Sequence, residues 1–333
     1  MLENYPIDMV YLWCDGSDPD FRAKKNYYQK KEGLLVSDSY STGEVRFQDN
    51  NELKYSLRSL EMYAPWINHI FIVTDRQVPK WLNTSYPKVT VIDHSQILPK
   101  EMIPTFASDI IESYIGFIPN LIEHFLYSND DMFFNKPVKP EFFFQQGKPV
   151  ARLKVDKEIA EIHSLEDFNS EYQRIDTWYK TLMNVWKILY KTHHIFNQYE
   201  IHHNIDSFLR SDYLKTFHKY KDYIENNTTR FRSEKNINRI IFNLESVYNG
   251  TAILKLLRDP THWQKKLAPF IKLQIDSLYA EDTPRSLRSI DKLCPYLFCV
   301  NSAISGNIYQ NKHEALKFYE RHFPNPSSFE NVL

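Results

Sequence analysis

Two adjacent carboxylates, Asp130 and Asp131, follow an apolar run and an asparagine near the middle of the chain. The run, residues 125–128, is rich in aromatic and aliphatic side chains and predicts a buried strand that ends in a turn. Two ionised carboxylates about 5 Å apart repel by about 3 kcal/mol at an effective dielectric constant of about 20. A partly buried pair therefore needs a cation, a donor or a proton, and Mg²⁺ commonly uses one or two carboxylates with phosphate oxygens. The alternative is that Asn129, Asp130 and Asp131 form a solvated turn.

Two further groups could take part in phosphate chemistry. His202 and His203 are candidates for a general base, because imidazole is the side chain whose ordinary pKa lies near neutrality. Arg232 follows a polar turn at the entrance to a predicted helix, where a guanidinium could bind a phosphate through two hydrogen bonds. Each has a plainer alternative: most histidines are surface or packed residues, and a helix-entry arginine often pairs with a nearby acid.

The elements that would position these residues alternate between strands and helices in the first half. Apolar runs at 7–13, 70–75, 89–94 and 125–128 predict strands, each ending at or near an aspartate, and 150–155 predicts another. Helices are predicted from residue 49 to Pro65 and over 108–115. This order predicts an α/β fold with a largely parallel sheet flanked by helices, whose strand ends bring acidic residues to one edge.

The second half changes character after residue 156. Amphipathic segments at 165–190, 206–224, 233–248 and 312–322 predict a mostly helical region. A late apolar run, residues 296–300, predicts a strand that returns to the core. We therefore expect an α/β nucleotide-sugar and metal-binding core over 1–156, and a helical region over 157–333 that completes the active site on the acceptor side.

Composition limits the classes of partner and compartment. The 333 residues carry 41 basic and 42 acidic side chains, so no basic footprint for nucleic acid is present. Three cysteines match no zinc spacing and suggest a reducing compartment. No run of apolar residues is long enough to span a membrane, and neither phosphate-binding glycine motif occurs. These features predict a cytoplasmic protein, with a peripheral position at the inner face of the plasma membrane left open.

Four stretches form an ordered series: residues 7–19, residues 46–134, a divided third stretch at 202–206 and 229–233, and residues 298–301. The second contains Asp49-Asn50-Asn51-Glu52 and ends near Asn129-Asp130-Asp131. In this order they resemble the four conserved regions of the Stealth family of sugar-phosphate transferases, which includes capsule enzymes and relatives of N-acetylglucosamine-1-phosphotransferase. The last stretch departs from the family pattern, because Ser302 stands where the family usually has aspartate.

The resemblance implies a GT-A-like fold and a metal-dependent reaction. It implies that Asp130 and Asp131 hold Mg²⁺ or Mn²⁺, that Arg232 meets phosphate oxygens, and that His202 or His203 acts as the base. Asp131 is thereby both a metal ligand and a catalytic residue. The donor site would be lined by Asp15, Asn51, Arg58, Asp109, Glu112 and Asn301.

The implied reaction transfers a sugar-1-phosphate from a UDP-sugar to a hydroxyl of a lipid-linked or polysaccharide acceptor. UMP is released, and a phosphodiester forms in a bacterial capsular or other cell-surface polysaccharide. Two alternatives stay open at this point: a glycosyltransferase that releases UDP, and an inactive saccharide-binding protein, which Ser302 motivates.

Overall fold

The main sheet has five strands in the order β3-β2-β1-β4-β9. The computed structural model describes residues 5–34, 42–155, 164–172, 175–195, 199–258, 274–302 and 308–331. Strands β1 (Asp8–Leu12), β2 (Ile70–Thr74), β3 (Val89–Asp93) and β4 (His124–Asn129) are parallel, and β9 (Asp206–Leu209) is antiparallel to β4. All five residues of β1 and of β2 are buried, which explains why these strands are continuous apolar runs.

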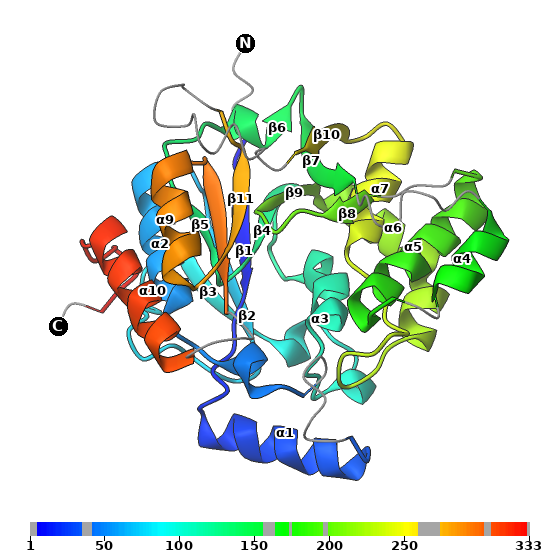
Figure 1. Cartoon of the computed structure of the whole chain (residues 1–333), viewed down its shortest axis with the longest axis horizontal. Helices are drawn as coiled ribbons and strands as arrows, with labels where there is room; N and C mark the ends of the chain where they lie inside the picture. Colours follow the sequence, from blue (N-terminus) through cyan, green and yellow to red (C-terminus); the bar gives the residue numbers. More distant parts are fainter. Residues whose placement is uncertain are drawn as a thin grey trace.

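Helices cover both faces of this sheet (Figure 1). Alternate residues of a strand point to opposite faces, so β1 sends Met9 and Tyr11 to one core and Val10 and Leu12 to the other. The first core includes α2 (Glu52–Tyr63). The second is formed with four helices: α3 (Ser108–Tyr114), α5 (Thr177–His193), α6 (Arg210–Asn226) and α7 (Ile240–Tyr248).

Two smaller sheets extend the fold. One has the order β10-β7-β6, with β8 also paired to β7; the other has the order β11-β12-β5. Their strands are β5 (Met132–Phe134), β6 (Phe144–Gln145), β7 (Lys148–Val155), β8 (Tyr199–Ile201), β10 (Ile253–Leu257), β11 (Ser277–Glu281) and β12 (Leu297–Asn301). The remaining helices are α1 (Pro19–Lys31), α4 (Leu165–Tyr172), α9 (Pro284–Leu293) and α10 (Ile308–His322).

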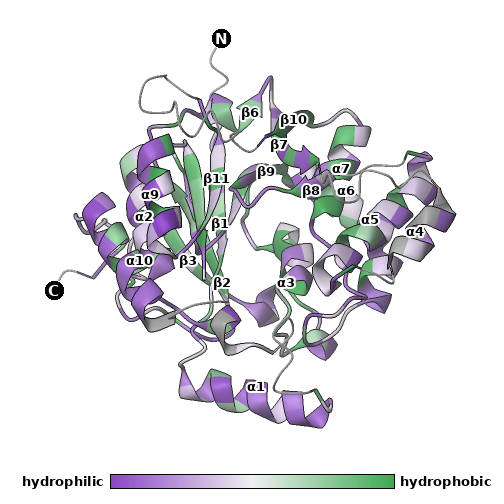
Figure 2. Ribbon diagram, viewed as in Figure 1, coloured by the Kyte–Doolittle hydropathy of each residue, from purple (hydrophilic) through white to green (hydrophobic). Residues whose placement is uncertain are grey.

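Hydrophobic residues are concentrated in the main sheet, whereas α1 is mostly hydrophilic (Figure 2). Only Phe21, Lys25 and Gln29 of α1 are buried among its described side chains. Within the described ranges, no helix is both long enough and apolar enough to cross a lipid bilayer.

The predicted α/β class with a largely parallel sheet is confirmed, and the four predicted main-sheet strands agree with β1 to β4 to within about one residue. The prediction for 206–224 was wrong at its start, since Asp206–Leu209 forms β9 and α6 begins only at Arg210. The single helix predicted over 165–190 is two helices, and the Asp176 side chain caps the second by accepting from the Tyr179 amide. The expected boundary at 156/157 lies outside the described residues.

Candidate active site

The carboxyl ends of β1 to β4 meet at one edge of the sheet, and an aspartate stands at or just after three of them. Two of these carboxylates bind neighbouring groups. Asp75 lies 2.6 Å from Lys24 Nζ, and Asp93 accepts hydrogen bonds from the amides of Arg76 and Ser95. These contacts fix neighbouring loops, and the third aspartate, Asp130, is the candidate for chemistry.

Asp130 and Asp131 form the turn between β4 and β5, and both are half-buried. Burial, with the charges of Asp131, Glu52 and Asp49, holds the pKa of Asp130 well above its usual range. Burial raises the pKa of Asp131 to about 6, although the Cys299 thiol donates to its Oδ2 at 3.3 Å. Asp131 Oδ1 is buried and has no hydrogen-bond partner in the described part of the chain. The turn therefore holds negative charge with too few donors.

Glu52 completes this acidic group, and the sequence alone did not single it out. It is the first residue of α2, is buried, and accepts hydrogen bonds from the backbone amide and side-chain amide of Asn50 at 2.5 and 2.7 Å. Burial raises its pKa to about 7, and the Asp49 charge adds to this. An acid at the start of a helix is ordinarily read as part of a cap, so only burial distinguishes Glu52.

Asp15 and Asn51 flank the acidic group. Asp15 lies in the loop after β1, where its Oδ1 accepts from the amide and hydroxyl of Ser17 at 2.8 and 2.6 Å. Its charge contributes to a raised pKa at Asp49, for which burial is the main cause. Asn51 has a left-handed φ of 63°, which asparagine tolerates, and its amide donates to Asp49 Oδ1 at 2.9 Å. Both residues thus lie near the acidic turn.

Arginines and carboxylates from α3, β9 and the loop before α7 form a second cluster. Arg232 Nε lies 3.2 Å from Asp109 Oδ1, and its Nη2 donates to the Ser108 hydroxyl at 2.5 Å. Arg239 is buried, forms an ion pair with Asp206, and places its Nε 3.5 Å from Glu112 Oε2.

The sequence did not indicate Arg239 or Asp206, because their partners are remote in the chain. The signal that could have found them is burial, since a buried charge requires a partner.

The hydroxyl of Tyr127 links this cluster to the acidic turn. It lies 2.9 Å from Glu112 Oε1 and 2.7 Å from the side-chain oxygen of Asn129, so it can donate to either. Burial raises the pKa of Glu112, while the charge of Arg239 counteracts this rise. Asn129 immediately precedes Asp130, so the two clusters are joined through one side chain on β4.

The two histidines lie in the connection between β8 and β9. His202 is buried, and the half-buried ring of His203 lies 5.1 Å from the ring of Tyr279 on β11. Burial lowers the pKa of His203 to about 4, and the charges of His202, Lys154, Arg239 and Arg232 contribute. At neutral pH the ring is uncharged, as a proton acceptor must be.

Tyr279, which sequence reasoning also missed, connects His203 to the end of β12. Burial raises its pKa to about 12, and a hydrogen bond with the side chain of Asn301 opposes the rise. Asn301 follows Cys299, the donor to Asp131, by two residues on the same strand. The predicted residue Asn301 is therefore on the same side of the molecule as the acidic turn.

Arg58 is the predicted site residue that the structure does not bring to this group. Its guanidinium donates from Nε and Nη2 to the two carboxylate oxygens of Glu330 at 2.6 and 2.8 Å. Its Nη1 donates to the carbonyl oxygens of Phe323 and Pro324 at 2.9 and 3.3 Å. These bonds use the guanidinium to fasten the segment after α10 to α2.

The carboxylates at the turn suit a hard divalent cation that takes most of its other ligands from water or substrate. No group of three or more His, Cys, Asp or Glu side chains is arranged to hold a metal ion among the residues the structure describes. Mg²⁺ typically takes one or two carboxylates and completes its shell with water and substrate phosphate oxygens. The buried Asp131 oxygen without a partner and the raised pKa of Asp130 fit such an ion.

Two family models match the chain. The one described as Stealth protein conserved region 2 matches residues 46–151, and the one described as conserved region 1 matches residues 5–33. These matches contain the first two predicted stretches, 7–19 and 46–134. The remaining predicted stretches, at 202–206, 229–233 and 298–301, lie outside the matched residues.

Curated relatives carry related names. The chain is 42% identical over 168 residues to the capsular polysaccharide phosphotransferase cps1A of Actinobacillus pleuropneumoniae, a match that covers 49% of this chain and 45% of the relative. It is thus matched to less than half the length of that relative. A second relative, the capsular polysaccharide phosphotransferase fcs1 of Haemophilus influenzae, is 29% identical over 326 residues, which covers 96% of this chain and 82% of the relative.

Among solved structures, the chain is similar to the galactosyltransferase LgtC in complex with donor and acceptor sugar analogues. The TM-score is 0.43 at 9% identity, and the alignment covers 93% of this chain and 95% of the other.

Proposed function

Because the chain belongs to the Stealth family, we propose that it transfers a sugar-1-phosphate from a UDP-sugar to a hydroxyl of an acceptor sugar. The acceptor oxygen attacks the sugar-bearing phosphorus, the bond from that phosphorus to the bridging oxygen breaks, and UMP leaves. The product is a phosphodiester in a capsular or other cell-surface polysaccharide. The observation that carries the proposal is the under-compensated acidic turn at Asp130 and Asp131.

The acidic turn and the cluster of arginines and carboxylates are proposed to divide the work of phosphoryl transfer, which depends on positioning and charge neutralisation. Asp130 and Asp131 are assigned to hold Mg²⁺ or Mn²⁺, which would neutralise charge on the diphosphate when bound. Arg232 is assigned to the phosphate oxygens, and Asp109 fixes its guanidinium from one side. Its side chain is 22% exposed.

His203 is the better of the two histidines as a base. It is half-buried rather than buried, and its ring is uncharged at neutral pH, the state in which a ring nitrogen can accept the hydroxyl proton. A pKa of about 4 also makes it a weaker base than an ordinary imidazole. His202, which is 4% exposed, then supports the loop that carries it. Both residues, like Arg232, come from the second half of the chain, which is why we assign residues 157–333 to completing the site and binding the acceptor.

The donor side is assigned to residues of the first half. They are Asp15 and Asn51, which lie near Asp49, and Glu112, which Tyr127 links to Asn129. Asn301 of β12 is assigned to the same side. The acceptor is proposed to be a lipid-linked or polymeric glycan that reaches a cytoplasmic enzyme at the inner face of the plasma membrane. Such an enzyme needs only peripheral contact with lipid.

The decisive experiment incubates purified protein with a panel of UDP-sugars, Mg²⁺ and a crude lipid-linked acceptor, and identifies the nucleotide released. UMP that depends on both metal and acceptor supports the proposal. UDP would instead indicate a glycosyltransferase that breaks the bond between the sugar carbon and oxygen. Absence of turnover across the panel, with saccharide binding retained, would favour the inactive binding protein.

A further inference from the structure

A cavity lies at the opposite edge of the main sheet from the acidic turn. It has a volume of about 330 Å³ and is formed where β1, β2 and β4 begin and along β3. The five residues of β1 separate the two edges by roughly 16 Å, at the usual rise of a strand. We propose that this cavity binds one neutral sugar unit of a glycan, at a distance from the reaction.

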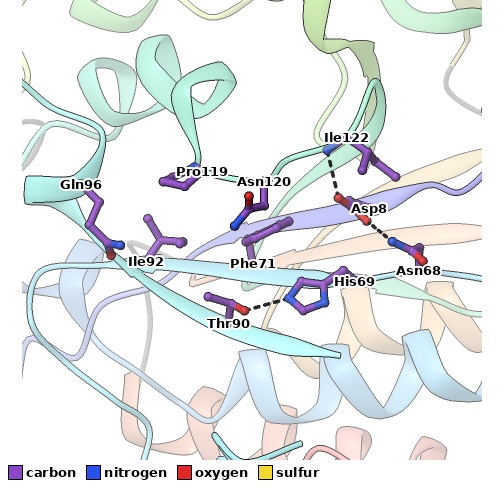
Figure 3. Close-up of a pocket in the computed structure, with 10 residues that line it drawn as sticks. All are labelled: Asp8, Asn68, His69, Phe71, Thr90, Ile92, Gln96, Pro119, Asn120 and Ile122. Carbon is purple, nitrogen blue, oxygen red and sulfur yellow. Dashed lines mark hydrogen bonds between the residues drawn. The ribbon is translucent and has the colours of Figure 1, made fainter. Parts of the chain in front are cut away.

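The cavity is built from polar side chains on fixed partners (Figure 3). Asp8 is 1% exposed, and its two carboxylate oxygens accept from Asn68 Nδ2 at 2.8 Å and from the Ile122 amide at 3.2 Å. His69 Nε2 and the Thr90 hydroxyl are 2.8 Å apart. Preformed hydrogen bonds of this kind hold the walls in place before a ligand enters, which reduces the entropy lost on binding.

The charges of the lining select against ionic ligands. Neither lysine nor arginine lines the cavity, and the one acid, Asp8, disfavours phosphate or carboxylate ligands. Asp8 is also an unsuitable cation site, because a single carboxylate already bonded to two donors offers too few oxygens. Burial raises the pKa of Asp8 and lowers that of His69.

The remaining lining matches the two surfaces of a pyranose ring. Asn68, Gln96 and Asn120 carry amides, which both donate to and accept from hydroxyl groups. Phe71 and Ile92, which are 4% and 2% exposed, make the apolar part of the lining. The volume is at the lower end of the range for small-molecule pockets, about 300–1,000 Å³, and so suits one sugar rather than a nucleotide.

Such a site would hold a distant part of a polymeric acceptor while its end reacts at the other edge. Two weak contacts on one chain raise the effective concentration of the reacting end without any new contact at the active site. The inference concerns binding alone and does not depend on the proposed reaction.

Methyl glycosides of glucose, galactose and N-acetylglucosamine, titrated into the full chain without metal or nucleotide, test the site. We expect at least one to perturb the imidazole NMR signals of His69, with an affinity weakened at least tenfold by Thr90→Leu, which fills the cavity. Thr84→Leu makes the same change at an exposed loop residue outside the lining and should bind as the wild type does.

A second variant guards against misfolding. Asn120→Gly removes a lining amide at a residue whose φ of 64° suits glycine, and it should also weaken binding. Asp131→Asn, at the other edge, should leave glycoside binding unchanged even where it abolishes turnover. Failure of all three glycosides to perturb His69, or equal affinity in Thr90→Leu, Asn120→Gly and the wild type, would overturn the inference.

Discussion

The first turn and the middle of helix α2 treat charge in opposite ways. At its start, Glu52 stands near Asp49, Asp130 and Asp131, and burial raises the pKa of each of these four carboxyl groups. Near the middle of the helix, Arg58 binds both oxygens of Glu330. There, burial acts to raise the pKa of Glu330, but the bonds from Arg58 and from the Ser327 amide bring it below its usual range.

The difference separates scaffold from site. Paired charges, as at Arg58 and Glu330, fix one chain segment on another and are complete within the protein. Uncompensated charges lower the stability of the folded chain, and a protein retains them where an external group, such as a cation or a substrate, supplies the missing partner. The chemical identity of a charged residue therefore says less about function than whether its partner is already present.

The largest expected effect is the loss of folding stability when the pair Arg58–Glu330 is broken. Arg58→Ala leaves the Glu330 carboxylate, 6% exposed, without its main partner and should lower the free energy of unfolding by about 3–5 kcal/mol. Urea unfolding at neutral pH measures this. The double variant Arg58→Met with Glu330→Gln should lose much less than the sum of the single changes. If Arg58→Ala unfolds like the wild type but is inactive, Arg58 acts in the donor site. The contrast between the Arg58–Glu330 pair and the acidic group around Glu52 then fails.

The next effect is on the rate of turnover when proposed active-site charges are removed. Asp131→Asn and Arg232→Ala should each reduce turnover by a factor of about 10² to 10³, because each removes a group that stabilises charge in the transition state. The matched control is Asp222→Asn, an exposed aspartate on α6, which should retain full turnover. UMP release at saturating donor, with circular dichroism as a check on folding, gives the comparison. Near-full activity in Arg232→Ala would remove it from the site.

The contributions of Asp131 and Glu330 to folding stability should change with pH in opposite directions. The pKa of Asp131 rises from 3.8 to about 6 on folding, so its favourable contribution is complete below pH 3.8 and is lost as pH rises through 6. Without metal, Asp131→Asn should therefore be more stable than the wild type at about pH 7.5, by about 1–2 kcal/mol for this half-buried group. The gain should disappear in acid.

Glu330 has a lowered pKa, so its contribution is present above its unfolded pKa and is lost as pH falls through the folded value. Glu330→Gln should accordingly be less stable than the wild type at neutral pH and equal to it in acid. Urea titrations of both variants across this range compare the two signs. If both variants are more stable, or both less stable, than the wild type at neutral pH, the distinction between paired and uncompensated carboxylates is wrong.

The smallest expected effect is stabilisation by the ion itself. Mg²⁺ at about ten times its dissociation constant should stabilise the folded chain by about 1.4 kcal/mol, through binding to the native state alone. Thermal unfolding with Mg²⁺ and with EDTA measures the shift, which Asp131→Asn should abolish and Arg58→Lys should keep. An equal shift in Asp131→Asn would place the ion elsewhere.

The fold was predictable where the burial pattern is one-sided or complete. Continuous apolar runs predicted β1, β2 and β4, which are mostly buried between the two cores, and also β3, which is only partly buried. Asp206–Leu209 was not recognised as a strand, because four residues leading into an amphipathic helix share no period of their own. Its role in the sheet comes from pairing with β4, which is a contact between distant segments.

For the candidate site, the sequence indicated the acidic turn and Arg232 but not the buried partners around them. Asp130 and Asp131 stand out because an acid pair after a buried strand is unusual, and Arg232 because it follows a polar turn. Nothing in the sequence distinguishes Arg239. Its partner is the carboxylate of Asp206 on β9, which is 33 residues away in the chain. Arg58 shows the reverse: the resemblance marked it, but its partner Glu330 lies 272 residues away.

The antiparallel strand β9 has a consequence for how the molecule folds. It completes the main sheet beside β4, yet the chain between Asn129 and Asp206 first builds β5 to β8, α4 and α5. Closing so long a loop before its contacts form slows folding. The loop from β8 to β9 carries both histidines, so we expect the proposed catalytic arrangement to be among the last parts to form during refolding, after the four parallel strands have paired.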